Sequence, residues 1–142
     1  MLKEVSKKVL VVLIGIIVAS LTVGLVEWIG HLAYPDNDFK VDMTRKEMSV
    51  VVANMPAMAL LIVGIAWMFG CFLGCLVTRG MNKQIPLVAA LTPGLLTMFG
   101  GIIMFIRIPH PVWFVVISLI IAGVGTYFGE LKGREIQLGK LG

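Results

Sequence analysis

Four long stretches of this chain carry no charged residue, and this segregation constrains the fold more than any other feature. Asp, Glu, Lys, Arg and His are all absent from residues 9–26, 48–78, 84–106 and 111–129. A bilayer core about 30 Å thick is crossed by a helix of about 20 apolar residues. The pattern predicts an all-α membrane protein with four transmembrane helices, over about residues 9–33, 56–78, 85–106 and 112–131.

The composition leaves no room for a soluble domain beside these helices. Of the 142 residues, 58% are hydrophobic and 14% are charged, whereas soluble domains carry about 25% charged residues. The basic N-terminus followed by an apolar run is similar to a signal peptide, but the run exceeds the usual apolar region of about 7–15 residues. We therefore predict a single domain, residues 1–142, folded as an up-down bundle whose first helix is retained.

Basic residues are unevenly divided between the two ends of the predicted bundle. Eight fall on the side of the termini: Lys3, Lys7, Lys8, Arg79, Lys83, Lys132, Arg134 and Lys140. Four fall on the opposite side: Lys40, Arg45, Lys46 and Arg107. Cytoplasmic loops carry the excess of Lys and Arg, so both termini are predicted to be cytoplasmic. The basic residues lie at helix ends, as the membrane topology alone requires. They form no basic face with aromatic residues of the kind that binds nucleic acid.

Glu27 is the main candidate for a functional residue, because it ends the first apolar run. Ser20, Gly24, Glu27 and His31 share one face of a helix, and such a small or polar stripe favours contact with protein or water over lipid. We predict that this stripe faces the bundle interior or a subunit interface. A carboxylate there serves either as a proton or cation site, or as a structural partner of His31 or Arg107.

A wider set of residues lies at the same predicted membrane depth. The candidate ligand-binding or ion-binding residues are Glu27, His31, His110, Ser20, Arg107 and Trp113. Two histidines and one carboxylate also form a possible metal-ligand set, namely Glu27, His31 and His110. The alternative is that both imidazoles contact water and lipid headgroups. No other cofactor is indicated.

The connector before the second span contains the one predicted helix that does not cross the membrane. Thr44 and Glu47 have the spacing of a capping box, in which each side chain bonds the backbone amide of the other residue. A short amphipathic helix is therefore expected to begin near Arg45. It either lies in the membrane interface or continues into the second span through a bend at Pro56.

Small residues recur at helical spacing in two of the spans. These packing rows are Ala66, Gly70 and Gly74, and Gly125 and Gly129. Such rows let helices approach closely, within one chain or between two copies, and we favour contacts within the chain. Cys71 and Cys75 are interpreted as small packing residues, since a regular helix does not give such a pair disulfide geometry.

The third span contains a predicted helix break. Pro93 has no backbone N–H, so one hydrogen bond of the helix is lost, and Gly94 follows it directly. We predict a bend or local unwinding over residues 92–94.

Two motifs resemble a known pattern. Residues 27–35, Glu-Trp-Ile-Gly-His-Leu-Ala-Tyr-Pro, and residues 109–114, Pro-His-Pro-Val-Trp-Phe, resemble those of small bacterial four-helix membrane proteins without an assigned activity. In that group an acid, a Gly-His pair and a proline end the first helix, and Pro-His-Pro precedes the last. The resemblance implies a bacterial inner-membrane setting and one site shared by both motifs. It implies no catalytic role.

Three functions remain open at this point. The first is a self-associating membrane protein that binds or conducts an ion, a proton or a small ligand around Glu27, in the outer half of the bundle. The second is a non-catalytic accessory or scaffold subunit of a larger membrane complex. The third is a membrane enzyme with a Glu/His metal site, which we favour least. The expected partners are membrane lipid and a second copy or another membrane protein.

Overall fold

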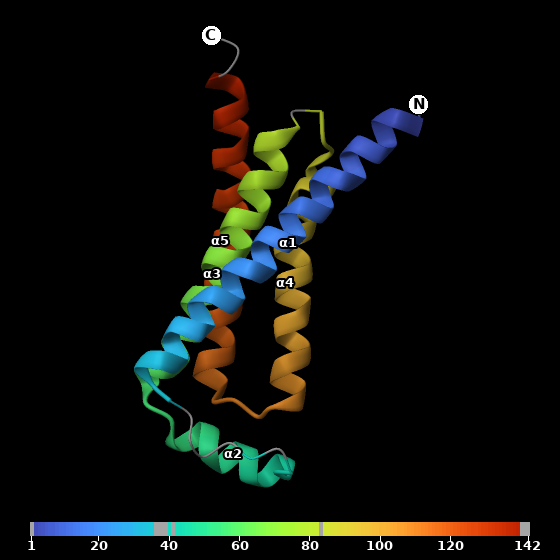
Figure 1. The fold of residues 1–142 in the computed structure, drawn as a ribbon. Coiled ribbons are helices and arrows are strands. Elements are labelled where there is room, and N and C mark those ends of the chain that lie inside the picture. Colours follow the sequence, from blue (N-terminus) through green and yellow to red (C-terminus); the bar gives the residue numbers. More distant parts are fainter. Residues whose placement is uncertain (1, 36–39, 41, 83, 140–142) are drawn as a thin grey trace.

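Five helices make up most of the computed structural model, which describes residues 2–35, 40, 42–82 and 84–139 (Figure 1). They are α1 (Leu2–Ala33), α2 (Arg45–Asn54), α3 (Ala57–Met81), α4 (Leu87–Arg107) and α5 (Val112–Gly139). No strand occurs in these described ranges. The predicted all-α class is confirmed, and α1, α3, α4 and α5 are each long and apolar enough to cross a membrane.

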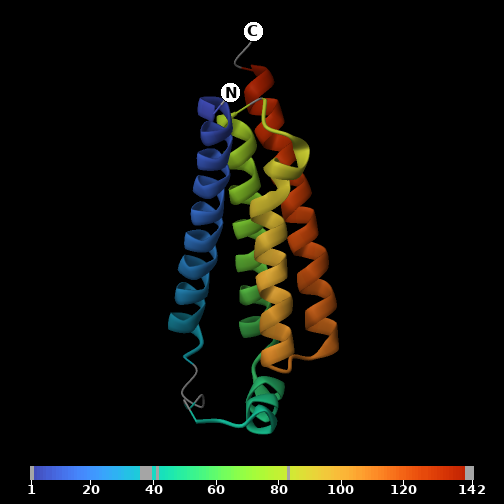
Figure 2. The ribbon, with the colours of Figure 1, turned by 90° about the vertical axis from the view of Figure 1, so that its right-hand side faces the viewer.

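The other three long helices pack around α3. This helix contacts α1, α4 and α5, while α4 also contacts both α1 and α5. The start of α1 and the end of α5 lie at one end of the molecule, which we call the terminal end (Figures 1 and 2). The short helix α2 lies across the opposite end, which we call the α2 end.

Two helices extend further than the sequence pattern predicts. Helix α1 begins at Leu2 rather than near residue 9, and α5 continues to Gly139 rather than ending near residue 131. Charged residues occupy both extensions, and the apolar pattern marks only the part of a helix that is free of charge. Hydrogen bonding along the helix does not depend on that pattern, so polar turns continue each helix. Lys83 and Lys140 lie outside the described residues.

Many buried positions are small residues, while many of the large apolar side chains point outward. Ala66, Cys71, Cys75, Ala90 and Ala122 are fully buried. Large exposed side chains occur on every long helix, among them Leu21, Phe69, Phe99 and Ile120. Close backbone approach with apolar side chains outside is the arrangement that suits helices surrounded by lipid.

Glycines set the closest helix contacts. A Cβ on Gly125 or Gly129 would overlap the backbone of α3 at Met68 or Phe72, so only glycine allows α5 to lie so near. Gly70 and Gly74 likewise lie against α1, at Ala19. The predicted packing rows therefore lie at helix contacts within this chain.

Helix α4 is continuous through its proline. Pro93 is buried within the helix Leu87–Arg107, so the predicted local unwinding at residues 92–94 does not occur. Cys75 donates to the carbonyl of Leu91 across 3.8 Å, and Cys71 donates to that of Gly94 across 3.6 Å. These thiols from α3 supply carbonyls near the proline with donors. Both cysteines are free and buried.

Helix α2 is separate from α3 and covers the α2 end. Its predicted capping box is present, because the Thr44 amide donates to Glu47 across 2.7 Å and the Glu47 amide donates to the Thr44 hydroxyl across 3.4 Å. The Thr44 amide and the Thr44 hydroxyl both donate to the Glu47 carboxylate, and these two bonds hold its pKa below the usual value. Val52 buries its side chain against Leu60 and Phe114, which attaches α2 to the ends of α3 and α5.

Candidate functional site

A cavity of about 180 Å³ opens at the α2 end, between α1, α2, α3, the end of α4 and the connector after it. Most of its wall is aliphatic, aromatic or thioether carbon, contributed by residues such as Val52, Met55, Leu60, Val63 and Phe105. Its polar lining, within the described part of the chain, consists of Glu27, His31, Tyr34, Trp67 and His110. A mostly apolar pocket with a few convergent polar groups is the usual form of a small-ligand site.

Glu27 is held in this cavity by a hydrogen bond from α3. The indole Nε1 of Trp67 donates to the Glu27 Oε1 across 3.0 Å. The bond occupies one of the two carboxylate oxygens, and a carboxylate accepts about four hydrogen bonds in all. Acceptor capacity is therefore left for a ligand in the cavity.

Trp67 reaches the carboxylate because α4 gives its ring room. Only 7% of Trp67 is exposed, and a Cβ on Gly101 would overlap the six-membered part of its ring. A buried indole N–H needs an acceptor, and Glu27 supplies it. Gly101, Trp67 and Glu27 thus form one chain of contacts from α4 through α3 to α1.

Aromatic rings continue the wall from Trp67 to the connector after α4. The ring centroids of Trp67 and Phe105 are 5.2 Å apart, and those of Phe105 and His110 are also 5.2 Å apart. Phe114 completes the cluster behind them, with its centroid 5.3 Å from that of His110. These spacings are typical of favourable aromatic pairs.

His110 lies in this wall, where burial of its ring disfavours the charged form. Burial lowers the pKa of His110 below its ordinary value, while a hydrogen bond with the backbone of Ile108 raises it to a smaller extent. Its Nδ1 lies 2.6 Å from the Ile108 carbonyl oxygen, which can only accept, so Nδ1 is assigned the proton. The Nε2 atom is then an acceptor.

The three residues proposed from the sequence as a metal set all line this one cavity: Glu27, His31 and His110. Within the described ranges, however, no three His, Cys, Asp or Glu side chains are grouped closely enough to hold a metal ion. The metal hypothesis therefore has no structural support. The hypothesis assumed that residues at the same membrane depth lie close together. Equal depth does not bring their ligand atoms within reach of one ion.

The other predicted site residues lie apart from the cavity. Ser20 and Gly24 are exposed, and apart from its chain neighbours and the nearby backbone of α1, no described residue has an atom within 4 Å of a Cβ placed on Gly24. The half of the predicted stripe that contains them therefore does not face the interior of the chain, and a subunit interface there stays a prediction. Arg107 and Trp113 are exposed at the ends of their helices and are not part of the cavity wall.

The face of α1 that packs against α3 is rotated by one residue from the predicted stripe. Val11, Gly15 and Ala19 are its buried positions, and they are spaced by four. Ala19 precedes Ser20, and neighbouring residues of a helix differ by about 100° in direction. Glu27, about two turns beyond Ala19, contacts Trp67 on α3, whereas Ser20 is exposed.

Sequence reasoning missed Trp67 as the partner of Glu27. The available signal was a tryptophan in the middle of an apolar span, where its N–H has no water to bind and needs an acceptor on another helix. The acidic residue at the end of the first span, Glu27, was the obvious acceptor for this N–H. Which helix it faces depends on the packing of α1 against α3, and no local pattern states this.

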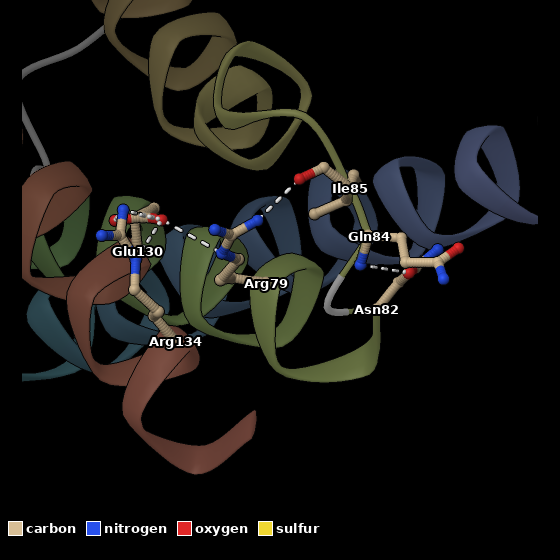
Figure 3. Close-up of polar contacts among 6 residues, drawn as sticks. All are labelled: Arg79, Asn82, Gln84, Ile85, Glu130 and Arg134. Atoms are coloured by element: carbon tan, nitrogen blue, oxygen red, sulfur yellow. Dashed lines mark hydrogen bonds and ion pairs between the residues drawn. The ribbon is translucent and has the colours of Figure 1, made fainter. Parts of the chain in front are cut away.

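A second polar cluster lies at the terminal end (Figure 3). Glu130 on α5 is 4% exposed and pairs with Arg79 on α3 across 3.1 Å and with Arg134 across 2.9 Å. Arg79 also donates to the Ile85 carbonyl across 2.6 Å. The cluster joins α3, α5 and the connector before α4, so we interpret it as structural.

Comparison with protein families, curated proteins and solved structures identifies no match for this chain.

Proposed function

We propose that this chain is a multi-pass membrane protein that binds a small ligand in the cavity around Glu27. The observation that carries the proposal is the Glu27–Trp67 hydrogen bond of 3.0 Å inside a mostly apolar cavity. A carboxylate near hydrocarbon costs free energy unless it has hydrogen-bonding or charged partners, and such groups often mark functional sites. Here one oxygen has a partner and the carboxylate borders open space of ligand size.

The proposed membrane arrangement places the four long helices across the bilayer of a bacterial inner membrane in up-down order. The exposed large apolar side chains on these helices support it, since in this arrangement they contact lipid. Four of the chain's basic residues fall on the side of the α2 end and eight on the other. The positive-inside rule then places the termini in the cytoplasm and the Glu27 cavity toward the outer face.

Self-association is part of the proposal. The exposed Ser20 and Gly24 allow close approach of a second α1, because no other described helix has an atom within 4 Å of a Cβ on Gly24. The cavity itself is lined within one chain. Ligand binding is therefore expected in a single copy as well as in an oligomer.

Ligand-dependent stabilisation tests the proposed binding function. The melting of the purified chain in a neutral detergent is measured with a panel of cationic, anionic and neutral compounds of about seven heavy atoms, a size set by the cavity volume. Ala59 lines the cavity, so Ala59→Leu reduces its volume, while Ala57→Leu changes an exposed position on the same helix as the control.

We expect at least one compound to raise the melting temperature of the wild type and of Ala57→Leu but not of Ala59→Leu. Mass action gives about 2.7 kcal/mol of stabilisation at a ligand concentration one hundred times Kd. If every compound affects wild type and Ala59→Leu equally, the cavity is not a ligand site.

A further inference from the structure

We propose that the ligand of the Glu27 cavity is a small organic cation with an apolar body, of the quaternary ammonium type, bound by the Glu27 carboxylate and the aromatic faces of Trp67 and Phe105. This inference rests on the proposed binding function and assigns the chemical class of its ligand. Four properties of the wall support it: charge, aromatic content, lack of oxygen ligands and size.

The charge of the wall favours a cation. The titratable groups that line the cavity are Glu27, His31, Tyr34 and His110, and no Lys or Arg is among the described lining residues. His110 is half-buried, and burial lowers the pKa of its ring, which disfavours a positive charge there. An anion would meet the Glu27 carboxylate without a lysine or arginine beside it, whereas a cation would have that carboxylate as its counter-charge.

The aromatic content favours a cation that lacks N–H donors. Rings attract a cation placed over their faces within about 6 Å of the centroid, and Trp67 and Phe105 lie side by side with centroids 5.2 Å apart. Most of the remaining wall is hydrocarbon and accepts no hydrogen bond. A quaternary ammonium presents methyl groups to such a wall and loses no hydrogen bond there.

The wall does not suit an inorganic cation. Calcium takes about six to eight oxygen ligands, and Glu27 is the one carboxylate among the described residues that line the cavity. No three-residue metal group exists within the described ranges. A cation that supplies its own apolar shell replaces the missing oxygen ligands.

The size of the cavity limits the ligand. An engineered apolar cavity of about 150 Å³ holds a benzene molecule, and this cavity measures about 180 Å³. A molecule of about six to eight heavy atoms therefore fits. Trimethylammonium with a short polar arm has this size, whether it occurs as a free solute or as a lipid headgroup.

A pair of matched ligands tests the inference on the full chain in a maltoside detergent, which carries no ammonium group. Choline and 3,3-dimethyl-1-butanol have the same shape, but a carbon replaces the cationic nitrogen in the alcohol. Binding of each is measured by calorimetric titration at constant ionic strength. We expect choline to bind at least ten-fold more tightly than the alcohol.

Substitutions assign this preference to the wall. Glu27→Gln should abolish it, and Glu135→Gln, which removes an exposed acid at the other end of the molecule, should leave it unchanged. Phe105→Leu retains the carboxylate and removes one aromatic face, so choline should lose about five-fold or more in affinity while the alcohol changes little. This second variant keeps the test valid if Glu27→Gln fails to fold.

The outcomes separate this inference from the proposed function. Equal binding of choline and the alcohol, with Ala59→Leu abolishing both, overturns the cationic class and leaves a ligand site. Absence of binding, together with no selective compound in the melting panel, overturns both. Dihexanoylphosphatidylcholine, titrated below its micelle concentration, identifies the source: tighter binding than choline assigns the cavity to a headgroup, and weaker binding assigns it to a free solute.

Discussion

At the scale of single residues, the site depends on a glycine, Gly101, whose lack of a side chain leaves room for Trp67. Gly101 leaves the space that the Trp67 ring fills, and the ring position delivers its N–H to Glu27. The adjacent Gly100 is exposed, and apart from its chain neighbours and the nearby backbone of α4, no described residue has an atom within 4 Å of a Cβ placed on it. Two neighbouring glycines on one helix therefore differ completely in what they contact.

We expect Gly101→Ala to displace Trp67 and weaken its bond to Glu27. Overpacking of this kind costs about 1–3 kcal/mol, and the tryptophan emission should shift in a Trp28→Phe, Trp113→Phe background. Gly100→Ala should be neutral or stabilising by up to about 1 kcal/mol, because alanine favours the helix. Equal melting temperatures and emission spectra for the two variants would contradict this account of the Trp67 position.

His110 makes stability depend on pH. Burial lowers its pKa in the folded chain below the ordinary 6.5, so between these two values the unfolded chain binds more protons. The contribution of His110 is fully present above pH 6.5 and is lost as the pH falls through the folded pKa. As the pH is lowered through this window, we expect the free energy of unfolding of the wild type to fall, and that of His110→Gln to fall less.

The measurement is denaturation of both forms in detergent from pH 5 to pH 8. His31→Gln, which removes the other cavity histidine, is the matched variant and should retain the loss of stability assigned to His110. A pH profile that is the same in wild type and in His110→Gln would show that burial of His110 does not contribute.

At the scale of elements, α3 and α5 are held together by backbone contact as well as by side chains. Gly125 and Gly129 lie against the α3 backbone, whereas Gly123 meets only the end of the flexible Met98 side chain, 4.0 Å away, among the described residues. The buried Glu130 on α5 adds an ion pair with Arg79 on α3 at the terminal end. Glycine spacing therefore sets the distance between the two helices, and this ion pair fixes one end.

We expect Gly125→Ala and Gly129→Ala each to destabilise the chain by about 1–3 kcal/mol, because backbone atoms cannot move aside as a side chain can. Gly123→Ala is the control and should change stability by less than about 1 kcal/mol. Thermal melting of the three variants checks the order. Destabilisation by Gly123→Ala as large as that by the other two would mean that helix propensity, not close approach, is being measured.

The sequence predicts the existence and kind of the helices better than their contacts. Absence of charge over residues 48–78 or 84–106 is a property of one segment, so the spans follow directly. The contact between Glu27 and Trp67 joins residues 40 positions apart and depends on how α1 is rotated. Every face of an apolar helix is compatible with lipid, so the pattern does not show which face turns inward. It pointed to the stripe with Ser20, whereas the structure buries Ala19.

At the scale of the whole molecule, the cavity and the ion-pair cluster lie at opposite ends. Glu27 and His110 are at the α2 end, and Arg79 and Glu130 are at the terminal end. In the proposed orientation the cavity is open to ligands from outside the cell, with α2 lying in the outer interface. A site at this end would sample external solutes or outer-leaflet headgroups.

We expect single cysteines at the two ends to react from opposite sides of the membrane. In a chain with Cys71 and Cys75 replaced by alanine, Asp42→Cys should react with an impermeant maleimide in intact cells, and Gln84→Cys only after permeabilisation. Both positions are exposed, and the eight-to-four division of basic residues sets the direction. Labelling of Gln84→Cys in intact cells would reverse the proposed topology.

Melting of wild type and Glu27→Gln in detergent from pH 5 to pH 9 tests the central claim most directly. Gln keeps an acceptor for Trp67 but removes the charge, and a charged acceptor strengthens a hydrogen bond by about 1 kcal/mol. We predict that Glu27→Gln melts at a lower temperature in part of this range, while Glu135→Gln matches wild type. Identical curves for wild type and Glu27→Gln throughout would contradict a central role for this carboxylate.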